Sequence, residues 1–176
     1  GSDHIREKDG LWAIVAWLNI LAFANKEHAG TSVADVLQAH YKQYGRNFFS
    51  RYDYEEVESA GAQTMMSELR AKVTDPAFLG STQGSFKVAE AGDFSYTDPI
   101  DHSVSKNQGL YVRMEDGSRI VFRLSGTGSA GATIRLYVEK YSSMAAEYAA
   151  DVQEALRPII DVALQLSALQ RHTGRE

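Results

Sequence analysis

The stretch Phe122-Arg-Leu-Ser-Gly-Thr-Gly-Ser-Ala-Gly-Ala-Thr-Ile-Arg-Leu-Tyr137 decides the fold of this chain. Its middle, residues 125–132, holds three glycines, two serines, one threonine and two alanines. Apolar and β-branched residues alternate with polar ones on both sides, a pattern typical of strands, and the small residues between them predict a loop. The stretch therefore predicts two consecutive strands of an antiparallel sheet.

The two arginines that flank the loop are predicted to share one face of this sheet. Side chains alternate between the two faces along a strand. That alternation places Arg123 and Arg135 opposite the core, one at each end of the loop. The residues expected to face the core are Ile120, Phe122, Leu124, Ile134, Leu136 and Val138.

The loop between these arginines suits a phosphate group. Small residues let backbone N–H groups approach an anion closely, and the serine and threonine hydroxyls add donors. A guanidinium matches phosphate geometry with a bidentate fork. A plain Gly/Ser turn beside solvent-exposed arginines is the alternative interpretation, and the residues alone leave both open.

A dinucleotide fingerprint is formally present but lacks its context. Gly126-Thr-Gly-Ser-Ala-Gly131 matches G-x-G-x-x-G, a motif that must be followed by a helix. Here the β-branched run Thr133-Ile-Arg-Leu-Tyr-Val138 follows, which predicts a strand. No Gly-Lys-Ser/Thr closes the loop either, so a P-loop is excluded.

Further strands and turns surround this hairpin. Asp116-Gly117 lies between the alternating runs Gly109–Met114 and Ser118–Leu124, which predicts a hairpin with a type I′ turn. Residues 47–54, rich in aromatic side chains, predict another strand. Strands joined by tight turns, with helical segments around them, indicate an α+β domain whose antiparallel sheet carries helices on one face.

Helical spacing marks the remaining segments. One helix is expected where Ala62, Met65, Met66, Leu69 and Val73 recur, ending at Asp75-Pro76. The tail 145–171 is helical, and Pro158 is expected to kink it or to start a new helix. The acidic run 53–58 is interpreted as a helix N-terminus, where carboxylates favour the dipole.

Two helices are predicted near the beginning of the sequence. The apolar run Leu11–Ala24 predicts a fully buried helix capped by Asp9, and such a helix needs a partner surface. This suggests that a preceding domain exists. A second helix is expected to begin at a capping box formed by Ser32 and Asp35 and to end at Gly45.

Composition limits the possible functions. The 176 residues are 44% apolar and 23% charged, with a net charge of -5. We therefore expect no nucleic-acid partner, and any anion site must be local. The absence of cysteine excludes disulfides and thiolate chemistry. The longest apolar run has 14 residues, too short to span a bilayer, and no signal peptide precedes it. We expect no membrane partner and a cytoplasmic location.

Three segments resemble one known family. Residues 123–137 resemble the phosphate-binding loop in the last domain of phosphoglucomutases, within the phosphohexomutase superfamily. Gly1-Ser-Asp-His-Ile-Arg-Glu-Lys-Asp-Gly-Leu-Trp12 is similar to the end of the third domain's sugar-binding segment, and Tyr44–Val57 to the entry into the fourth domain. The resemblance keeps the order of the segments over nearly the whole chain.

The resemblance implies a fold and an activity. Its domain boundaries would be 1–30 for the end of the third domain, 31–46 for a connector helix, and 47–176 for a fourth domain like the TATA-box-binding-protein fold. Phosphoglucomutases interconvert glucose 1-phosphate and glucose 6-phosphate through glucose 1,6-bisphosphate. They use a phosphoserine and Mg²⁺ held in earlier domains, which would be the missing partners of this chain.

The resemblance also assigns roles to individual residues. It implies that the loop binds whichever substrate phosphate is not being transferred, and that Lys8 acts on the sugar hydroxyls or in proton transfer. No phosphoserine segment and no Asp-Gly-Asp-type metal cluster occurs in this sequence, so we expect the isolated chain to be inactive. The implied phosphate ligands are Arg123, Ser125, Gly126, Thr127, Gly128 and Arg135.

Two other functions remain possible for the same residues. The chain could come from a non-catalytic, phosphoglucomutase-related protein that serves as a binding or structural module. It could also be a standalone sugar-phosphate-binding domain, which would bind its ligand well by itself. The sequence upstream of Gly1 would separate the first of these from the enzyme, because a parent without a phosphoserine loop could not be a mutase.

Overall fold

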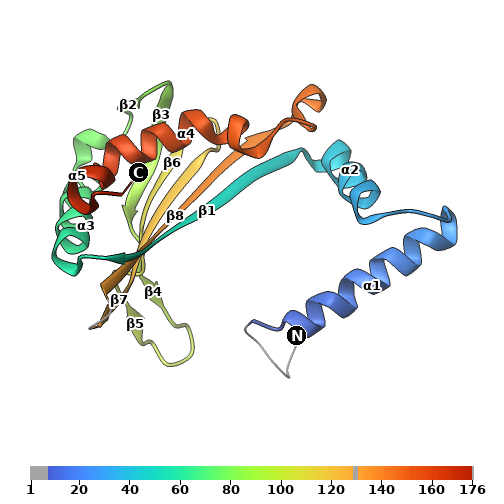
Figure 1. Ribbon diagram of the computed structural model, residues 1–176, viewed down its shortest axis with the longest axis horizontal. Helices are drawn as coiled ribbons and strands as arrows, with labels where there is room; N and C mark the ends of the chain where they lie inside the picture. Colours follow the sequence, from blue (N-terminus) through green and yellow to red (C-terminus); the bar gives the residue numbers. More distant parts are fainter. Residues whose placement is uncertain (1–7, 129–130, 176) are drawn as a thin grey trace. The chain divides into compact units, whose positions relative to one another are not determined.

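The computed structural model describes residues 8–128 and 131–175, and the chain forms two compact units. The helical unit comprises the described residues up to Arg46 together with Ser143–Tyr148. The sheet unit comprises the described residues of Asn47–Ser142 and those after Tyr148. Figure 1 shows the elements of both.

The helical unit contains α1 (Gly10–Glu27), α2 (Val33–Tyr44) and the short 3-10 helix η2 (Ala145–Glu147). The predicted caps are confirmed. The Asp9 side chain accepts a hydrogen bond from the Trp12 backbone N–H at 2.9 Å. Ser32 and Asp35 form a capping box, in which each side chain accepts from the other's backbone. Gly45 ends α2 with a φ of 83°, a conformation that favours glycine.

The expectation that residues 11–24 form a fully buried helix is wrong for the described part of the chain. The helix exists, but none of the described residues of α1 is buried. The side chains of Leu11 and Phe23 are 79% and 65% exposed. A helix that is apolar on all sides needs neighbours on all sides, and within the helical unit α1 does not have them.

The sheet unit is built on one six-stranded sheet with the order β1-β8-β7-β6-β3-β2. The β2–β3, β3–β6, β6–β7 and β7–β8 pairs are antiparallel. A two-stranded antiparallel ribbon, β4–β5, stands apart from this sheet. The strands are β1 (Arg46–Val57), β2 (Thr82–Gln83), β3 (Phe86–Asp93), β4 (Tyr96–Thr97), β5 (Val104–Ser105), β6 (Leu110–Met114), β7 (Arg119–Gly128) and β8 (Gly131–Ser142).

Three helices cover one face of this sheet: α3 (Ser59–Val73), α4 (Val152–Ser167) and α5 (Leu169–Thr173). Figure 1 shows them gathered on the same side. The core lies between the helices and the inward side chains of the strands. The predicted α+β class, with helices on one face of an antiparallel sheet, is confirmed. The buried residues of α3 are the five expected ones, namely Ala62, Met65, Met66, Leu69 and Val73.

The acidic run 53–58 lies in a strand up to Val57, so its prediction as a helix N-terminus is wrong except at Glu58, which is the N-cap residue of α3. Strand β1 continues to Val57, and α3 begins only at Ser59. The carboxylates lie along a strand because β1 pairs with β8, and Val57, at the strand's end, is buried in the core. This long-range pairing outweighs the local preference of acidic residues for a helix N-terminus.

The hairpin at Asp116-Gly117 is confirmed, but its turn is not type I′. A type I′ turn requires a positive φ at both central residues. Gly117 has a φ of 86°, whereas Asp116 is not among the described residues with positive φ. The Gly117 N–H donates to the Met114 carbonyl at 3.0 Å. The Asp116 carboxylate accepts from the Ser118 N–H at 2.9 Å, which stabilises this longer turn.

The tail contains more breaks than a single helix. It begins with η2, and the long helix α4 then runs through Pro158 without starting anew there. Of the two alternatives expected at Pro158, a kink or a new helix, the new helix is therefore wrong. The break comes at Ala168, which adopts a left-handed conformation with a φ of 47° and leads into α5. A further 3-10 helix, η1 (Pro76–Phe78), lies earlier in the chain.

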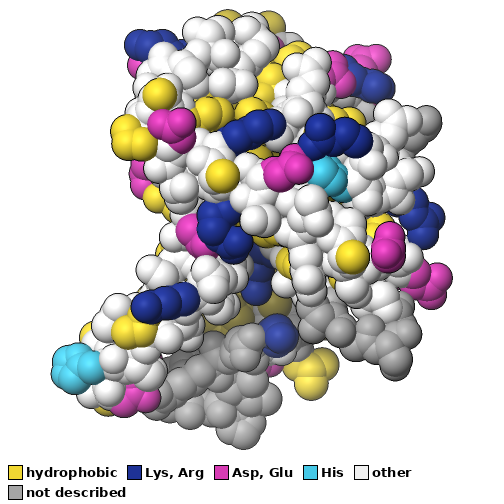
Figure 2. Space-filling view, turned by 90° about the vertical axis from the view of Figure 1, so that its left-hand side faces the viewer, with side chains coloured by type: hydrophobic (Ala, Val, Ile, Leu, Met, Phe, Trp, Pro, Cys, Tyr) yellow, Lys and Arg dark blue, Asp and Glu magenta, His cyan; other side chains and the backbone are white. Residues whose placement is uncertain are grey.

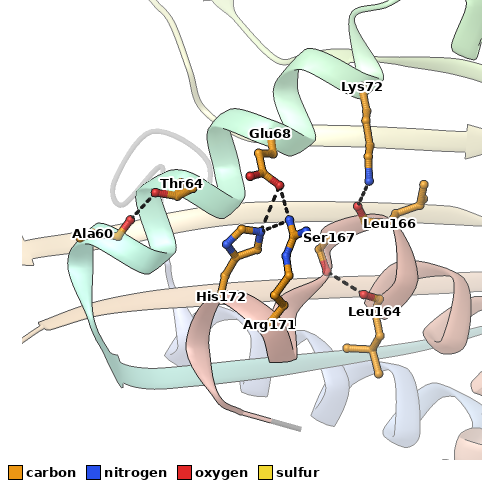
Figure 3. A network of polar contacts seen from close by, with 9 residues as sticks. All are labelled: Ala60, Thr64, Glu68, Lys72, Leu164, Leu166, Ser167, Arg171 and His172. Carbon is orange, nitrogen blue, oxygen red and sulfur yellow. Dashed lines mark hydrogen bonds and ion pairs between the residues drawn. The ribbon is translucent and has the colours of Figure 1, made fainter.

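Polar contacts join α3 to both α4 and α5 near the end of the chain (Figure 3). The Glu68 carboxylate is 2.5 Å from Arg171 Nη2 and 3.2 Å from His172 Nε2. Lys72 Nζ donates to the Leu166 carbonyl at 3.0 Å.

Charged side chains of both signs are mixed on the face drawn in Figure 2. Lysine and arginine side chains lie among aspartate and glutamate side chains there and do not form a patch of one sign.

Candidate phosphate-binding site

The two loop arginines form a direct cross-strand pair. In the β7–β8 register, Arg123 and Arg135 are Cα partners. Their neighbours Phe122 and Leu136 are also partners, and both are buried. Because side chains alternate along a strand, the arginines lie on the face away from the helices. The predicted placement of Arg123 and Arg135 on one face is confirmed.

The loop itself is an extension of the same hairpin. Ser125 pairs with Thr133, the register then shifts, and Gly128 pairs with Gly131. The backbone of Gly126, Thr127 and Gly128 continues β7. The side chain of Thr127 and the tip residues 129–130 lie outside the described part, so their predicted contacts with phosphate stay predictions.

Arg135 lies close to a carboxylate of the neighbouring strand. Its Nε is 3.7 Å from Oδ2 of Asp53, a residue of β1. The other Asp53 oxygen, Oδ1, is 3.0 Å from Nε of Arg51. Neither contact counts as an aligned hydrogen bond, since Asp53 Oδ1 and Arg135 Nε are both buried without a hydrogen-bond partner among the described residues. The carboxylate therefore acts on both arginines through charge.

Arg123 has a different environment. Its side chain is exposed, and it forms no ion pair or hydrogen bond with any described residue. The stem of Arg123 lies over Gly109: a Cβ added at Gly109 would be 3.1 Å from Arg123 Cγ and 3.1 Å from the Phe122 carbonyl oxygen. The absence of a side chain at Gly109 therefore leaves space for the stem of Arg123.

Arg123 also borders an open cavity of about 770 Å³ on this face of the sheet. Two charged residues on its wall are already paired, because Arg113 Nη1 is 3.1 Å from Glu90 Oε2. Tyr111 donates its hydroxyl to the other Glu90 oxygen at 2.9 Å, and this hydrogen bond raises the pKa of Tyr111. Glu90 is thus occupied, whereas Arg123 remains available to an incoming anion.

Lys8 belongs to the helical unit, directly before the Asp9 cap of α1. Its backbone has a φ of 50°. The role in sugar binding or proton transfer stays a prediction. The neighbouring residues 1–7, which carry part of the resemblance, lie outside the described residues.

The described residues contain neither a cluster of metal ligands nor a membrane-spanning helix. Within 8–128 and 131–175, no group of three or more histidine, aspartate and glutamate side chains is placed to hold a metal ion. Over the same ranges, the helices are all too short or too polar to cross a membrane.

The sequence interpretation missed two residues beside the arginines. The sequence places Asp53 both at the end of the predicted strand 47–54 and in the predicted helix N-terminus 53–58, and it places Gly109 at the start of an ordinary strand. The strand order carries the missing information, because β1 and β8 are far apart in sequence but adjacent in the sheet. A signal for Asp53 was available in its alternation with Arg51 along an extended segment.

Comparisons with known proteins show which family this chain resembles. Residues 46–176 match the family described as "Phosphoglucomutase-1, C-terminal domain". The chain is 54% identical over 179 residues to "Phosphoglucomutase-1" of Homo sapiens, covering 99% of this chain and 31% of that protein. It is 52% identical over 179 residues to "Phosphoglucomutase 1, chloroplastic" of Marchantia polymorpha, covering 99% of this chain and 27% of that protein.

A solved structure is similar over the full chain. The crystal structure of the phosphoglucomutase pp63/parafusin from Paramecium, in its open form, superposes with a TM-score of 0.82 at 47% identity. The match covers 100% of this chain and 30% of that one, so the chain spans about a third of the length of such relatives. The chain therefore belongs to the phosphoglucomutase family, and residues 46–176 match its C-terminal domain.

Proposed function

We propose that this chain is the C-terminal part of an isomerase of carbohydrate metabolism that interconverts glucose 1-phosphate and glucose 6-phosphate through glucose 1,6-bisphosphate. Its own role is to bind the substrate phosphate that is not being transferred. The observation that carries this proposal is the cross-strand pair Arg123 and Arg135 at the base of a Gly/Ser/Thr loop. Family membership supports the activity of the whole protein.

The chemistry of the loop residues fits this role. Two guanidiniums supply charge and forked donors for a phosphate dianion, and the hydroxyls of Ser125 and Thr127 add donors. Backbone N–H groups at Gly126 and Gly128 can approach closely because no side chain intervenes. Such donors recognise phosphate rather than sugar, so the loop can accept a phosphate on carbon 1 or on carbon 6. Holding one end of the substrate positions the other end for reaction.

The remaining machinery is proposed to lie in other domains of the same protein. Residues 1–30 would complete the third domain, 31–46 would connect it to the fourth, and 47–176 would form the fourth. Mg²⁺, which would assist transfer as a Lewis acid, is proposed to be held upstream, since the described residues offer no ligand cluster for it. A cytoplasmic location also stays a prediction, because relatives named chloroplastic exist.

Replacing Arg123 by alanine tests the site. In the 176-residue chain, titration with glucose 6-phosphate should shift the backbone amide resonances of residues 125–129. Arg123→Ala should weaken this binding at least about tenfold, because hydrogen bonds to charged groups contribute ~1.5–3 kcal/mol. Arg157→Ala is the matched control: it removes the same charge from an exposed position on α4, on the helical side of the sheet.

Shifts that appear elsewhere, with none in the loop, would refute the site. Equal weakening by Arg123→Ala and Arg157→Ala would refute a specific contact and leave only a general effect of charge. A mutase assay on the same chain is expected to show no turnover, because the chain has no phosphoserine segment. Turnover by this chain alone would contradict the proposed division between domains.

Gly109→Ala should weaken phosphate binding through Arg123. The new methyl group would displace the Arg123 stem, and an off-rotamer side chain costs about 0.5–1.5 kcal/mol, which predicts a several-fold loss of affinity for inorganic phosphate. Gly92→Ala is a suitable control, because its Cβ would instead meet the Tyr111 hydroxyl at 3.3 Å. Unchanged affinity in Gly109→Ala would show that the stem relaxes without moving the guanidinium.

A further inference from the structure

The cross-strand arginine pair poses an electrostatic problem. Like charges directly opposite each other in an antiparallel pair destabilise the sheet. Arg123 and Arg135 occupy such positions. A ligand phosphate would relieve the repulsion, and before the ligand binds a neighbouring carboxylate can do so.

Asp53 is the carboxylate placed to supply that charge. It projects from β1, the strand next to β8, with a side chain only 21% exposed. One carboxylate oxygen lies 3.7 Å from Arg135 Nε and the other 3.0 Å from Arg51 Nε. No carboxylate among the described residues forms such an ion pair with Arg123. One arginine of the pair is therefore held by a neighbour, and the other is not.

The exposure of Arg135 shows which part of it is held. The side chain is 40% exposed as a whole, yet its Nε is buried. The exposed area therefore belongs to the rest of the side chain, while the nitrogen nearest Asp53 is shielded from solvent. The charge of Asp53 therefore acts on the inner side of the guanidinium, and its other donors stay available to a ligand.

We propose that Asp53 is a positioning residue for phosphate binding: it fixes the guanidinium of Arg135, while Arg123 remains free to adapt to the ligand. This inference rests on the proposed function of the loop. A long side chain such as arginine loses rotamer entropy when a ligand immobilises it. If Asp53 already restricts Arg135, this rotamer entropy is lost when the protein folds and not when the ligand binds.

A fixed arginine and an adaptable one suit a ligand that arrives in two orientations. The fixed guanidinium defines where the phosphate lies. The adaptable guanidinium of Arg123, exposed above Gly109, can follow the different path of the sugar from carbon 1 or carbon 6. Two equally mobile arginines would bind phosphate with a larger loss of entropy.

Positioning by Asp53 and simple charge repulsion predict opposite changes in phosphate affinity when Asp53 loses its charge. A carboxylate beside an anion site repels the anion, so its removal should tighten binding if Asp53 has no other effect. If Asp53 positions Arg135, Asp53→Asn should weaken binding of inorganic phosphate to the 176-residue chain at least about threefold. Asparagine keeps the shape of aspartate, so the fold is expected to persist.

Glu139→Gln is the matched control. Glu139 of β8 pairs with Arg119 of β7, the two strands that also carry Arg135 and Arg123. The distance between Glu139 Oε1 and Arg119 Nη2 is 2.5 Å. The variant removes one negative charge near Arg119 and leaves Asp53 in place. Its phosphate affinity should stay equal to that of the unmodified chain or become slightly tighter. Equal or tighter binding by Asp53→Asn would overturn the proposal.

A second measurement separates this inference from the proposed function. In the ligand-free chain, the Nε–H proton of Arg135 should exchange with water slowly, because the atom is buried. Asp53→Asn should accelerate that exchange several-fold, whereas Glu139→Gln should not. Unaltered exchange in Asp53→Asn would refute positioning. A chain that shows this protection but binds no phosphate would instead refute the proposed function.

Discussion

Gly61→Ala should destabilise the chain by about 2–3 kcal/mol, although the same change inside a free helix would stabilise it by up to ~1 kcal/mol. A Cβ at Gly61 would lie 2.3 Å from the His172 carbonyl oxygen, so α5 must move away from α3. That movement pulls Leu169, which is fully buried, out of the core. It also separates Arg171 and His172 from Glu68, the contacts drawn in Figure 3.

Urea denaturation measures this effect, and two controls define its cause. At Gly10 an added Cβ meets nothing within 4 Å, so Gly10→Ala should not destabilise the chain. In a chain that ends at Ala168, the opposing carbonyl is absent, and Gly61→Ala should become neutral or stabilising. If Gly61→Ala is equally destabilising in that shortened chain, contact with α5 is not the cause.

Alanine substitution of two neighbouring residues of β8 should affect different properties: stability at Leu136 and phosphate binding at Arg135. Leu136→Ala should lower the free energy of unfolding by ~2–5 kcal/mol, because Leu136 is fully buried and its truncation leaves a cavity. Arg135→Ala should change stability by less than about 1 kcal/mol and weaken phosphate binding at least about tenfold. The contrast follows from the alternation of side chains along the strand.

Denaturation curves and phosphate titrations on both variants check this contrast. Leu79→Ala is the control for truncation of a leucine, since Leu79 is 51% exposed and should have little effect on stability. A Leu136→Ala chain that remains folded should still bind phosphate with near-normal affinity. Large stability losses in both Arg135→Ala and Leu136→Ala would mean that the arginine supports the sheet rather than the ligand.

The elements that could be predicted from sequence are those with a local signal. The spacing of apolar residues in α3 identified its five buried side chains, and the capping residues Asp9 and Ser32 identified two helix starts. The run 53–58 was misassigned because its acidic composition fits a helix start locally. Its pairing with β8 is a contact between distant segments, and no local pattern reports it.

In the candidate site, too, local patterns were predictable from the sequence and contacts between distant segments were not. Alternation along two adjacent strands was enough to place Arg123 and Arg135 on one face. It could not find Asp53, since that required knowing which strand lies beside β8. Likewise, the apolar composition of α1 identified a helix but not its burial. Burial depends on a partner surface, and the helical unit does not provide one around the whole helix.

The register of the β7–β8 hairpin also limits how a gene encoding this loop can change. Ser125 and Thr133 are the last paired residues before the register shifts. A codon gained or lost between them alters the length of the loop without reversing either arginine, because each strand keeps its own alternation. A codon gained or lost between Arg119 and Arg123 would instead turn Arg123 toward the helices. Variation in length is therefore tolerable at the tip of the hairpin and not along its sides.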